Sequence, residues 1–188
     1  MRTGTKSILF GVHQFVLHPI TVFIAWIYLY RKLPTFKEII CIIIHDWGYW
    51  GKKKMDDEEG EKHPELGAKI AHWLFDHPLV GAPWPNTTDY QDLCLLHSGH
   101  YARTLLREPS RLCWADKMSR FFEPWWLYLP RAWLSGELAE YRKLADSAGF
   151  ILISASHREW YRWIQSRLAK LGRERRATAV PYVNPKRF

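Results

Sequence analysis

The chain has 188 residues, is 47% hydrophobic and 24% charged, and carries a formal net charge of +8. This length and composition favour one compact domain with a single core, and no linker, low-complexity block or internal repeat divides the sequence. The three cysteines, Cys41, Cys94 and Cys113, lie far apart in apolar stretches without Cys-x-x-Cys spacing. This pattern excludes a disulfide framework and indicates a reducing compartment, so we expect a cytoplasmic protein.

The spacing of apolar residues predicts an all-α fold, with helices separated by proline and glycine and no alternating strand. The expected helices cover residues 7–17, 19–32, 36–47, 63–76, 88–105, 110–122, 136–147 and 154–171. The first apolar stretch is interrupted by histidines and a proline, which argues against a signal peptide, and residues 19–30 are too short to span a bilayer. Thr35 and Glu38 have the spacing of a capping box at the start of the third helix.

Residues of the kinds that bind metals stand at the ends of several expected helices. His45 and Asp46 directly follow the apolar residues 39–44. A buried helix rarely closes on two adjacent ionisable residues without a partner, and a metal ion is a suitable partner. Further residues in similar positions are His18, His63, His97 and Asp116. The series predicts that these side chains meet at a metal site.

In this order the residues resemble the ligand series of the HD-domain proteins, over residues 13–122. The most specific stretches are His45-Asp46-Trp47-Gly48, His63-Pro64-Glu65-Leu66-Gly67-Ala68 and Ala115-Asp116-Lys117. The second stretch is similar to the one that carries the third-motif histidine in the HD-GYP branch. The Gly-Tyr-Pro triplet of that branch is absent, because the chain reads Ser98-Gly99-His100-Tyr101 after His97.

The resemblance implies a single compact helical bundle with one or two divalent metal ions in its core. The implied ligands are Asp46 as a bridge, His18, His45 and Asp116 for one metal, and His63 with His97 for the second. His45 and Asp46 are the implied catalytic pair, and His13 stays an alternative to His18 as the first ligand. These ligand types leave Mn, Fe, Zn, Co, Ni and Mg open. We expect the helical domain over residues 1–172 and a basic tail over residues 173–188.

Four side chains near the expected ligands are candidates for contacts with a phosphorylated substrate: Lys52, His100, Arg103 and Lys117. Guanidinium and ammonium groups suit phosphate oxygens, and His100 would share a helix face with His97. An ordinary surface role is the alternative for each of them, as it is for Arg107, Glu58 and Glu59. His72, His77 and His157 fit no position of the family, and we expect them to be partly exposed.

The favoured function is a metal-dependent phosphohydrolase that acts on a small phosphorylated molecule, with a nucleotide first among the candidate substrates. An HD-type di-iron oxygenase is an alternative with the same ligand set. A third hypothesis is a non-catalytic module in which the aromatic residues 121–134 and the basic tail bind nucleic acid or an anionic membrane surface. For residues 121–134 we favour packing against the domain or a homodimer contact.

Overall fold

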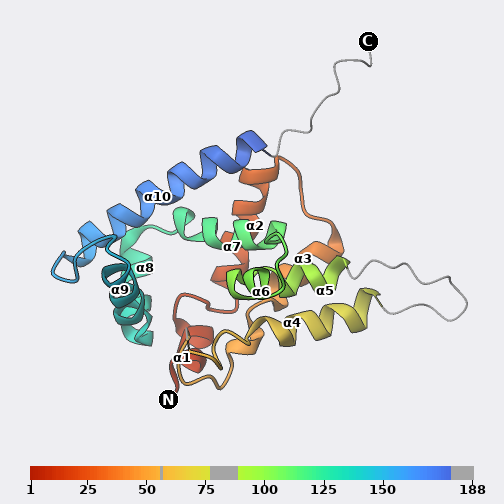
Figure 1. Cartoon of the computed structure of the whole chain (residues 1–188), viewed down its shortest axis with the longest axis horizontal. Coiled ribbons are helices and arrows are strands. Elements are labelled where there is room, and N and C mark those ends of the chain that lie inside the picture. Colours follow the sequence, from red (N-terminus) through yellow and green to blue (C-terminus); the bar gives the residue numbers. More distant parts are fainter. Residues whose placement is uncertain (56, 77–88, 179–188) are drawn as a thin grey trace, which may run out of the picture.

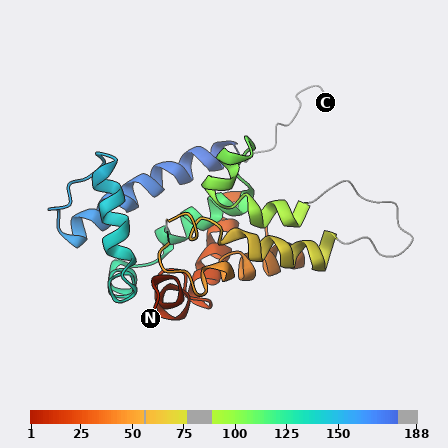
Figure 2. The same ribbon diagram turned by 60° about the horizontal axis from the view of Figure 1, so that its bottom comes forward.

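The computed structural model describes residues 1–55, 57–76 and 89–178, and the fold is all-α, as the sequence predicts. Figures 1 and 2 show how the helices are arranged. The α-helices of the described residues are α1 (Thr3–Phe10), α2 (Leu17–Tyr30), α3 (Phe36–Ile44), α4 (Pro64–Ala71), α5 (Asp89–Leu95), α6 (Gly99–Thr104), α7 (Arg111–Ser119), α8 (Trp125–Ser135), α9 (Glu137–Ser147) and α10 (His157–Thr178). Short helical turns at Trp47–Tyr49, His72–Asp76 and Arg120–Phe122 follow α3, α4 and α7.

The larger core lies between α2, α3, α4, α5 and α7, with α2 against α7 and α4 against α5. Its fully buried side chains include Trp26, Ile42, Leu112 and Met118. Burying a side chain of this size stabilises the fold by roughly 1.5–3 kcal/mol. This packing brings the start of α2, the end of α3 and the middle of α7 to one place in the core.

A smaller core joins α8, α9 and α10 and contains Tyr128, Leu138 and Trp160. Helix α10 has 22 residues, which corresponds to about 33 Å, and it runs along the top of the molecule in Figure 1. Leu168, near its middle, packs against the larger core. Helix α10 therefore connects the two cores along one side of the molecule.

The first helix was predicted over residues 7–17 but begins and ends earlier, at Thr3 and Phe10, and the aromatic segment is helical where no helix was predicted. Helix α1 ends at Phe10 because Gly11 is extended and the next N–H, that of Val12, donates to the carboxylate of Glu137 at 2.9 Å. Pro124 directly precedes α8, where a missing N–H costs no helical hydrogen bond. Pro130 lies inside α8, so the prolines of this segment do not exclude a helix, as the prediction had assumed.

The last helix is longer than predicted, because α10 continues to Thr178. Residues 173–178 of the expected tail are therefore helical, and residues 179–188 lie outside the described part of the chain. This stretch contains three arginines, one glutamate and one alanine, which are good helix formers. The end of the apolar stripe at residue 171 was thus a poor guide to the end of the helix.

The predicted helix 88–105 is two helices, α5 and α6, with a turn between them. The hydroxyl of Ser98 caps α6 by accepting from the N–H of His100 at 3.1 Å. The carbonyl of Leu96 accepts from the N–H of Ser110 at 3.0 Å, so it does not continue the hydrogen-bond pattern of α5. The prediction that His97 and His100 share a helix face was therefore wrong.

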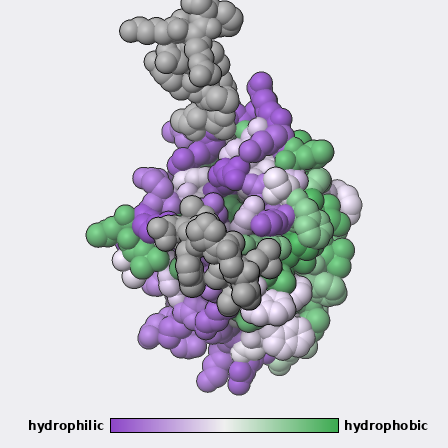
Figure 3. All heavy atoms as spheres, turned by 90° about the vertical axis from the view of Figure 1, so that its right-hand side faces the viewer, coloured by the Kyte–Doolittle hydropathy of each residue, from purple (hydrophilic) through white to green (hydrophobic). Residues whose placement is uncertain are grey.

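The exposed surface has an apolar side. In Figure 3 hydrophobic residues (green) gather along the right side, while the top and bottom are mainly hydrophilic (purple).

Helix α8 also exposes large apolar side chains. Its Trp126 and Trp133 are 61% and 66% exposed, whereas Tyr128 and Ala132 are buried in the smaller core. No helix in the described ranges combines the length and the apolar character needed to cross a membrane. A homodimer contact through the exposed tryptophans stays a prediction.

Candidate metal centre

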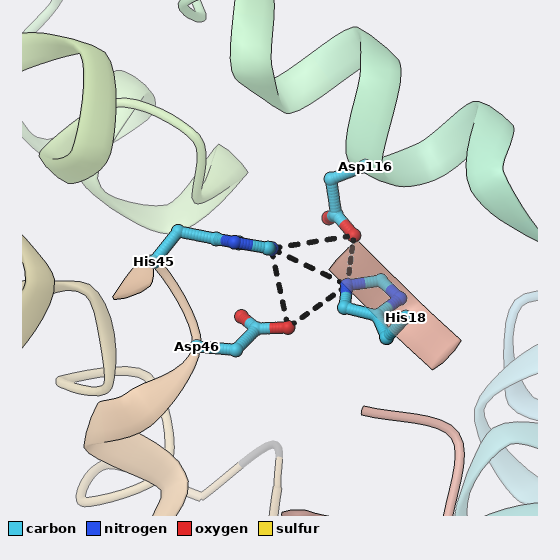
Figure 4. Close-up of side chains that lie close together, drawn as sticks. All are labelled: His18, His45, Asp46 and Asp116. Carbon is cyan, nitrogen blue, oxygen red and sulfur yellow. Dashed lines mark hydrogen bonds and ion pairs between the residues drawn. The ribbon is translucent and has the colours of Figure 1, made fainter. Parts of the chain in front are cut away.

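Four side chains of the predicted ligand series meet in the larger core. His18 lies in the first turn of α2, His45 ends α3, Asp46 is the next residue, and Asp116 lies on α7. Figure 4 shows the four side chains pointing toward one another. His18, His45 and Asp46 are at most 5% exposed. Solvent therefore contributes little to balancing their charges and lone pairs.

The ligand atoms of this first group lie close together. His18 Nε2 is 3.0 Å from Asp46 Oδ2, 3.2 Å from Asp116 Oδ1 and 3.3 Å from His45 Nε2. His45 Nε2 is 3.3 Å from Asp46 Oδ2 and 4.0 Å from Asp116 Oδ1. Two imidazole nitrogens and two carboxylate oxygens thus surround one point, and such a donor set suits several divalent metals.

Asp46 also belongs to a second group, with His63 and His97. Its Oδ1 atom is 3.3 Å from His97 Nε2 and 3.7 Å from His63 Nε2, and the two imidazole nitrogens are 3.1 Å apart. The two carboxylate oxygens of Asp46 therefore face different groups. This is the place at which the resemblance implies a bridging ligand.

Two glycines allow the second group to lie so close to the first. A side chain on Gly67 of α4 would lie 2.9 Å from the carbonyl oxygen of Ile44 and 3.0 Å from the Cα atom of His45. A side chain on Gly48 would overlap the carbonyl group of His63 at 1.9 Å. Both glycines lie in the quoted motifs, but the motifs alone do not show that the backbones touch at these positions.

Backbone carbonyl groups determine which ring nitrogen of three histidines carries hydrogen. Nδ1 of His45, His63 and His97 lies 2.8, 2.8 and 2.5 Å from the carbonyl oxygen three residues earlier. A carbonyl oxygen only accepts, so Nδ1 is the donor and Nε2 of the neutral ring has the lone pair. The lone pairs of His63 and His97 then face each other, which is unfavourable unless a cation lies between them.

The pKa shifts differ among the histidines of the centre. Burial lowers the pKa of His97, but the hydrogen bond to Asp46 and the charges of Asp46 and Asp116 together outweigh burial and raise it. Burial lowers the pKa of His18, but hydrogen bonds to Asp116 and Asp46 raise it by a larger amount, so that it reaches about 10. Burial and the neighbouring His97 lower the pKa of His63 to about 3. Burial raises the pKa values of both carboxylic acids, yet the surrounding histidines keep them below the usual value. At neutral pH the two carboxylates and His63 are therefore in the forms that bind metals.

His18 Nδ1 has no hydrogen-bond partner among the described residues, and the polar neighbours within ion-pair distance of the buried oxygens Asp46 Oδ2 and Asp116 Oδ1 are histidine Nε2 atoms. An unsatisfied buried polar atom costs about 1–3 kcal/mol. A cation between the ligand atoms would satisfy both oxygens. The buried cluster of histidines and aspartates can hold a metal ion, in either of the two groups that share Asp46.

His13, the alternative first ligand, lies beside the centre and belongs to neither group. Its Nε2 atom is 4.0 Å from Asp46 Oδ2, and its Nδ1 atom is 2.9 Å from the carboxylate of Glu137. Glu137 is fully buried and also accepts from the hydroxyls of Ser7 and Ser135. Glu137 could not be recognised from the sequence motifs, because it is a single acidic residue at the start of α9 with no ligand spacing around it.

The candidate substrate contacts have different surroundings. Lys52 forms an ion pair with Glu59 at 3.3 Å, and Arg107 forms one with Asp92 at 2.7 Å. His100 is partly exposed at the start of α6. His72 and His157 belong to neither ligand group, and His77 lies outside the described residues.

Arg103 and Lys117 lie together near the second ligand group. A side chain on Gly99, two residues after His97, would be 3.2 Å from Arg103 Nη1 and 3.8 Å from Lys117 Nζ. Neither cation forms an ion pair with a described residue. Of the four candidate contacts, these two are therefore the pair that the fold brings side by side.

Comparisons with known proteins found no match. No family model matches the chain, and no curated protein and no solved structure is similar to it at the significance required. The relation to HD-domain proteins therefore remains a proposal, supported by the motif residues and their geometry.

Proposed function

We propose that this protein is a metal-dependent phosphohydrolase of the HD-domain type, with a small phosphorylated molecule as its substrate. The observation that supports this most strongly is the position of Asp46, whose two carboxylate oxygens face two separate groups of imidazole nitrogens. Two cations held by one carboxylate would lie close enough to act on one phosphoryl group.

In this proposal His18, His45, Asp46 and Asp116 hold one divalent ion, and Asp46, His63 and His97 hold the second. Divalent ions in such sites supply a hydrolytic nucleophile near neutral pH and neutralise charge on the phosphoryl oxygens. The side chains of the protein orient these ions, since each Nδ1–H that donates to a backbone carbonyl fixes its ring.

Arg103 and Lys117 are the proposed contacts to the substrate phosphate. Their positive charges lie close together, because the Cβ position of Gly99 is within 4 Å of both side chains. Because neither is paired with a carboxylate of the described residues, both are free to neutralise a phosphate. A nucleotide is the first candidate substrate, as the resemblance implies.

The test combines metal analysis with turnover. Chelator-treated protein is loaded separately with manganese, cobalt, nickel, zinc, magnesium and iron, and phosphate release is measured from nucleotides and a generic phosphomonoester. The proposal expects phosphate release that needs a metal and is lost or strongly reduced in Arg103→Gln. Glu58→Gln, which changes a 91% exposed carboxylate that belongs to neither ligand group, should have no effect. Bound iron with oxygen consumption and no phosphate release would contradict the proposal in favour of the oxygenase.

A further inference from the structure

A basic hollow of about 660 Å³ lies between α7 and α10 and is lined by none of the metal ligands. Lys117 and Arg120 line it from the end of α7, and Arg167 and Lys170 line it from α10. Each pair is three residues apart on one helix face, which is about 4.5 Å along the axis. The views in Figures 1 and 2 both place α10 alongside α7. The volume is in the range of small-molecule sites.

Arg120 is the most enclosed of these cations. It is partly buried, and its Nε atom has no hydrogen-bond partner in the described structure. Its guanidinium group lies 5.1 Å from the centre of the Tyr141 ring, and no carboxylate of the described residues is within ion-pair distance. A guanidinium that is desolvated and not neutralised favours an anion as its partner.

Arg167 likewise has no carboxylate of a described residue within ion-pair distance. Its guanidinium group lies 4.9 Å from the ring centre of Phe150 and 5.5 Å from that of Trp163. Of the described residues that line the hollow, one is acidic: Glu174, whose carboxylate is 3.9 Å from the ammonium group of Lys170. Aromatic rings thus hold the arginines in place and leave their charge available, so the hollow has a clear excess of positive charge.

We propose that this hollow binds an oligophosphate, the di- or triphosphate group of a nucleotide or an inorganic oligophosphate. Two pairs of cations, one from the end of α7 and one from α10, match a chain of phosphates better than one phosphate, because a single phosphate would leave part of the positive charge unpaired. The hollow lies beside the metal centre, since Arg120 follows Asp116 by one helical turn on the same face. The inference shares Lys117 with the proposed substrate contacts, but the binding needs no metal, so it can be tested apart from the proposed hydrolysis.

The test measures binding to the full chain in the presence of a chelator and 0.15 M salt by titration calorimetry. The probes are inorganic tripolyphosphate, orthophosphate, adenosine triphosphate and a single-stranded oligonucleotide. Arg167→Gln should weaken tripolyphosphate binding about tenfold or more, and Lys117→Gln should weaken it in the same direction. Arg173→Gln is the matched control, because it removes the same charge from an exposed position of α10 that does not line the hollow.

Tripolyphosphate binding that is much tighter than orthophosphate binding, and is weakened by Arg167→Gln but not by Arg173→Gln, supports the inference. If adenosine triphosphate binds more tightly than tripolyphosphate with the same dependence, the ligand is a nucleotide; if it does not, an inorganic oligophosphate is favoured. Equal losses in both arginine variants, or no binding, would overturn the inference. So would tighter binding of a single-stranded oligonucleotide, which would indicate a nucleic-acid surface instead.

Discussion

Replacement of Asp46 by asparagine should disrupt both ligand groups at once. Asp46 Oδ2 lies 3.0 Å from His18 Nε2, and Oδ1 lies 3.3 Å from His97 Nε2. Asparagine keeps one oxygen and replaces the other by an NH₂ group, which is a donor and not a ligand. Loss of a residue that merely supports a ligand typically costs about 10- to 100-fold in metal affinity. We therefore expect Asp46→Asn to weaken metal binding by more than about 100-fold.

The same substitution should change the stability of the metal-free protein. Asp116 and Asp46 raise the pKa of His18 from 6.5 to about 10, in spite of its burial. This shift corresponds to about 4 kcal/mol of stability at pH 7, shared between two carboxylates, so Asp46→Asn should remove about 2 kcal/mol from the free energy of unfolding. The stabilisation is fully present below pH 6.5 and is lost as the pH rises through about 10. The wild type and the variant should therefore differ less at high pH.

Elemental analysis after loading with manganese, phosphate release, and urea unfolding with a chelator at several pH values measure these effects. Asp116→Asn is the matched control: it changes only the first group, so the protein should keep about one metal per chain in the second. Retention of wild-type metal content and phosphate release by Asp46→Asn would refute the inference that Asp46 joins the two groups.

Three further predictions follow from the same geometry. His63→Ala should lose one metal and keep the other, which elemental analysis measures; an unchanged metal content would exclude a site at His63. Metal binding at pH 8 should release close to one proton, because His18 has a pKa of about 10 without metal and must be neutral to bind it. Calorimetry in buffers of different ionisation enthalpy measures this release, and its absence would contradict the assignment of His18 as a ligand. Glu137→Gln should destabilise the fold by about 3–5 kcal/mol in urea unfolding, because its buried carboxylate accepts from several donors and the amide would place a donor among them. The exposed control Glu58→Gln should have no such effect, and a loss below about 1 kcal/mol for Glu137→Gln would show that the site tolerates a neutral amide.

Local sequence patterns were sufficient to predict the helical class and the types of residue at the metal centre. Thr35 and Glu38 form the predicted capping box, with hydrogen bonds of 3.3 and 2.7 Å. His45-Asp46 could be singled out because a polar pair at the end of an apolar helix needs a buried partner. Such features can be recognised from the sequence alone, because helical hydrogen bonds and caps join residues that are close in sequence.

Contacts between distant residues could not be predicted in this way. Glu137 lies 124 positions after His13, yet their side chains meet at 2.9 Å beside the centre. The basic hollow likewise combines Lys117 of α7 with Arg167 of α10. The bridging position of Asp46 between two ligand groups was implied by resemblance, but its two oxygens are assigned to different groups only by the folded arrangement. Each of these features depends on which helix faces pack against each other, and packing is set by the burial of the whole core and not by any local spacing.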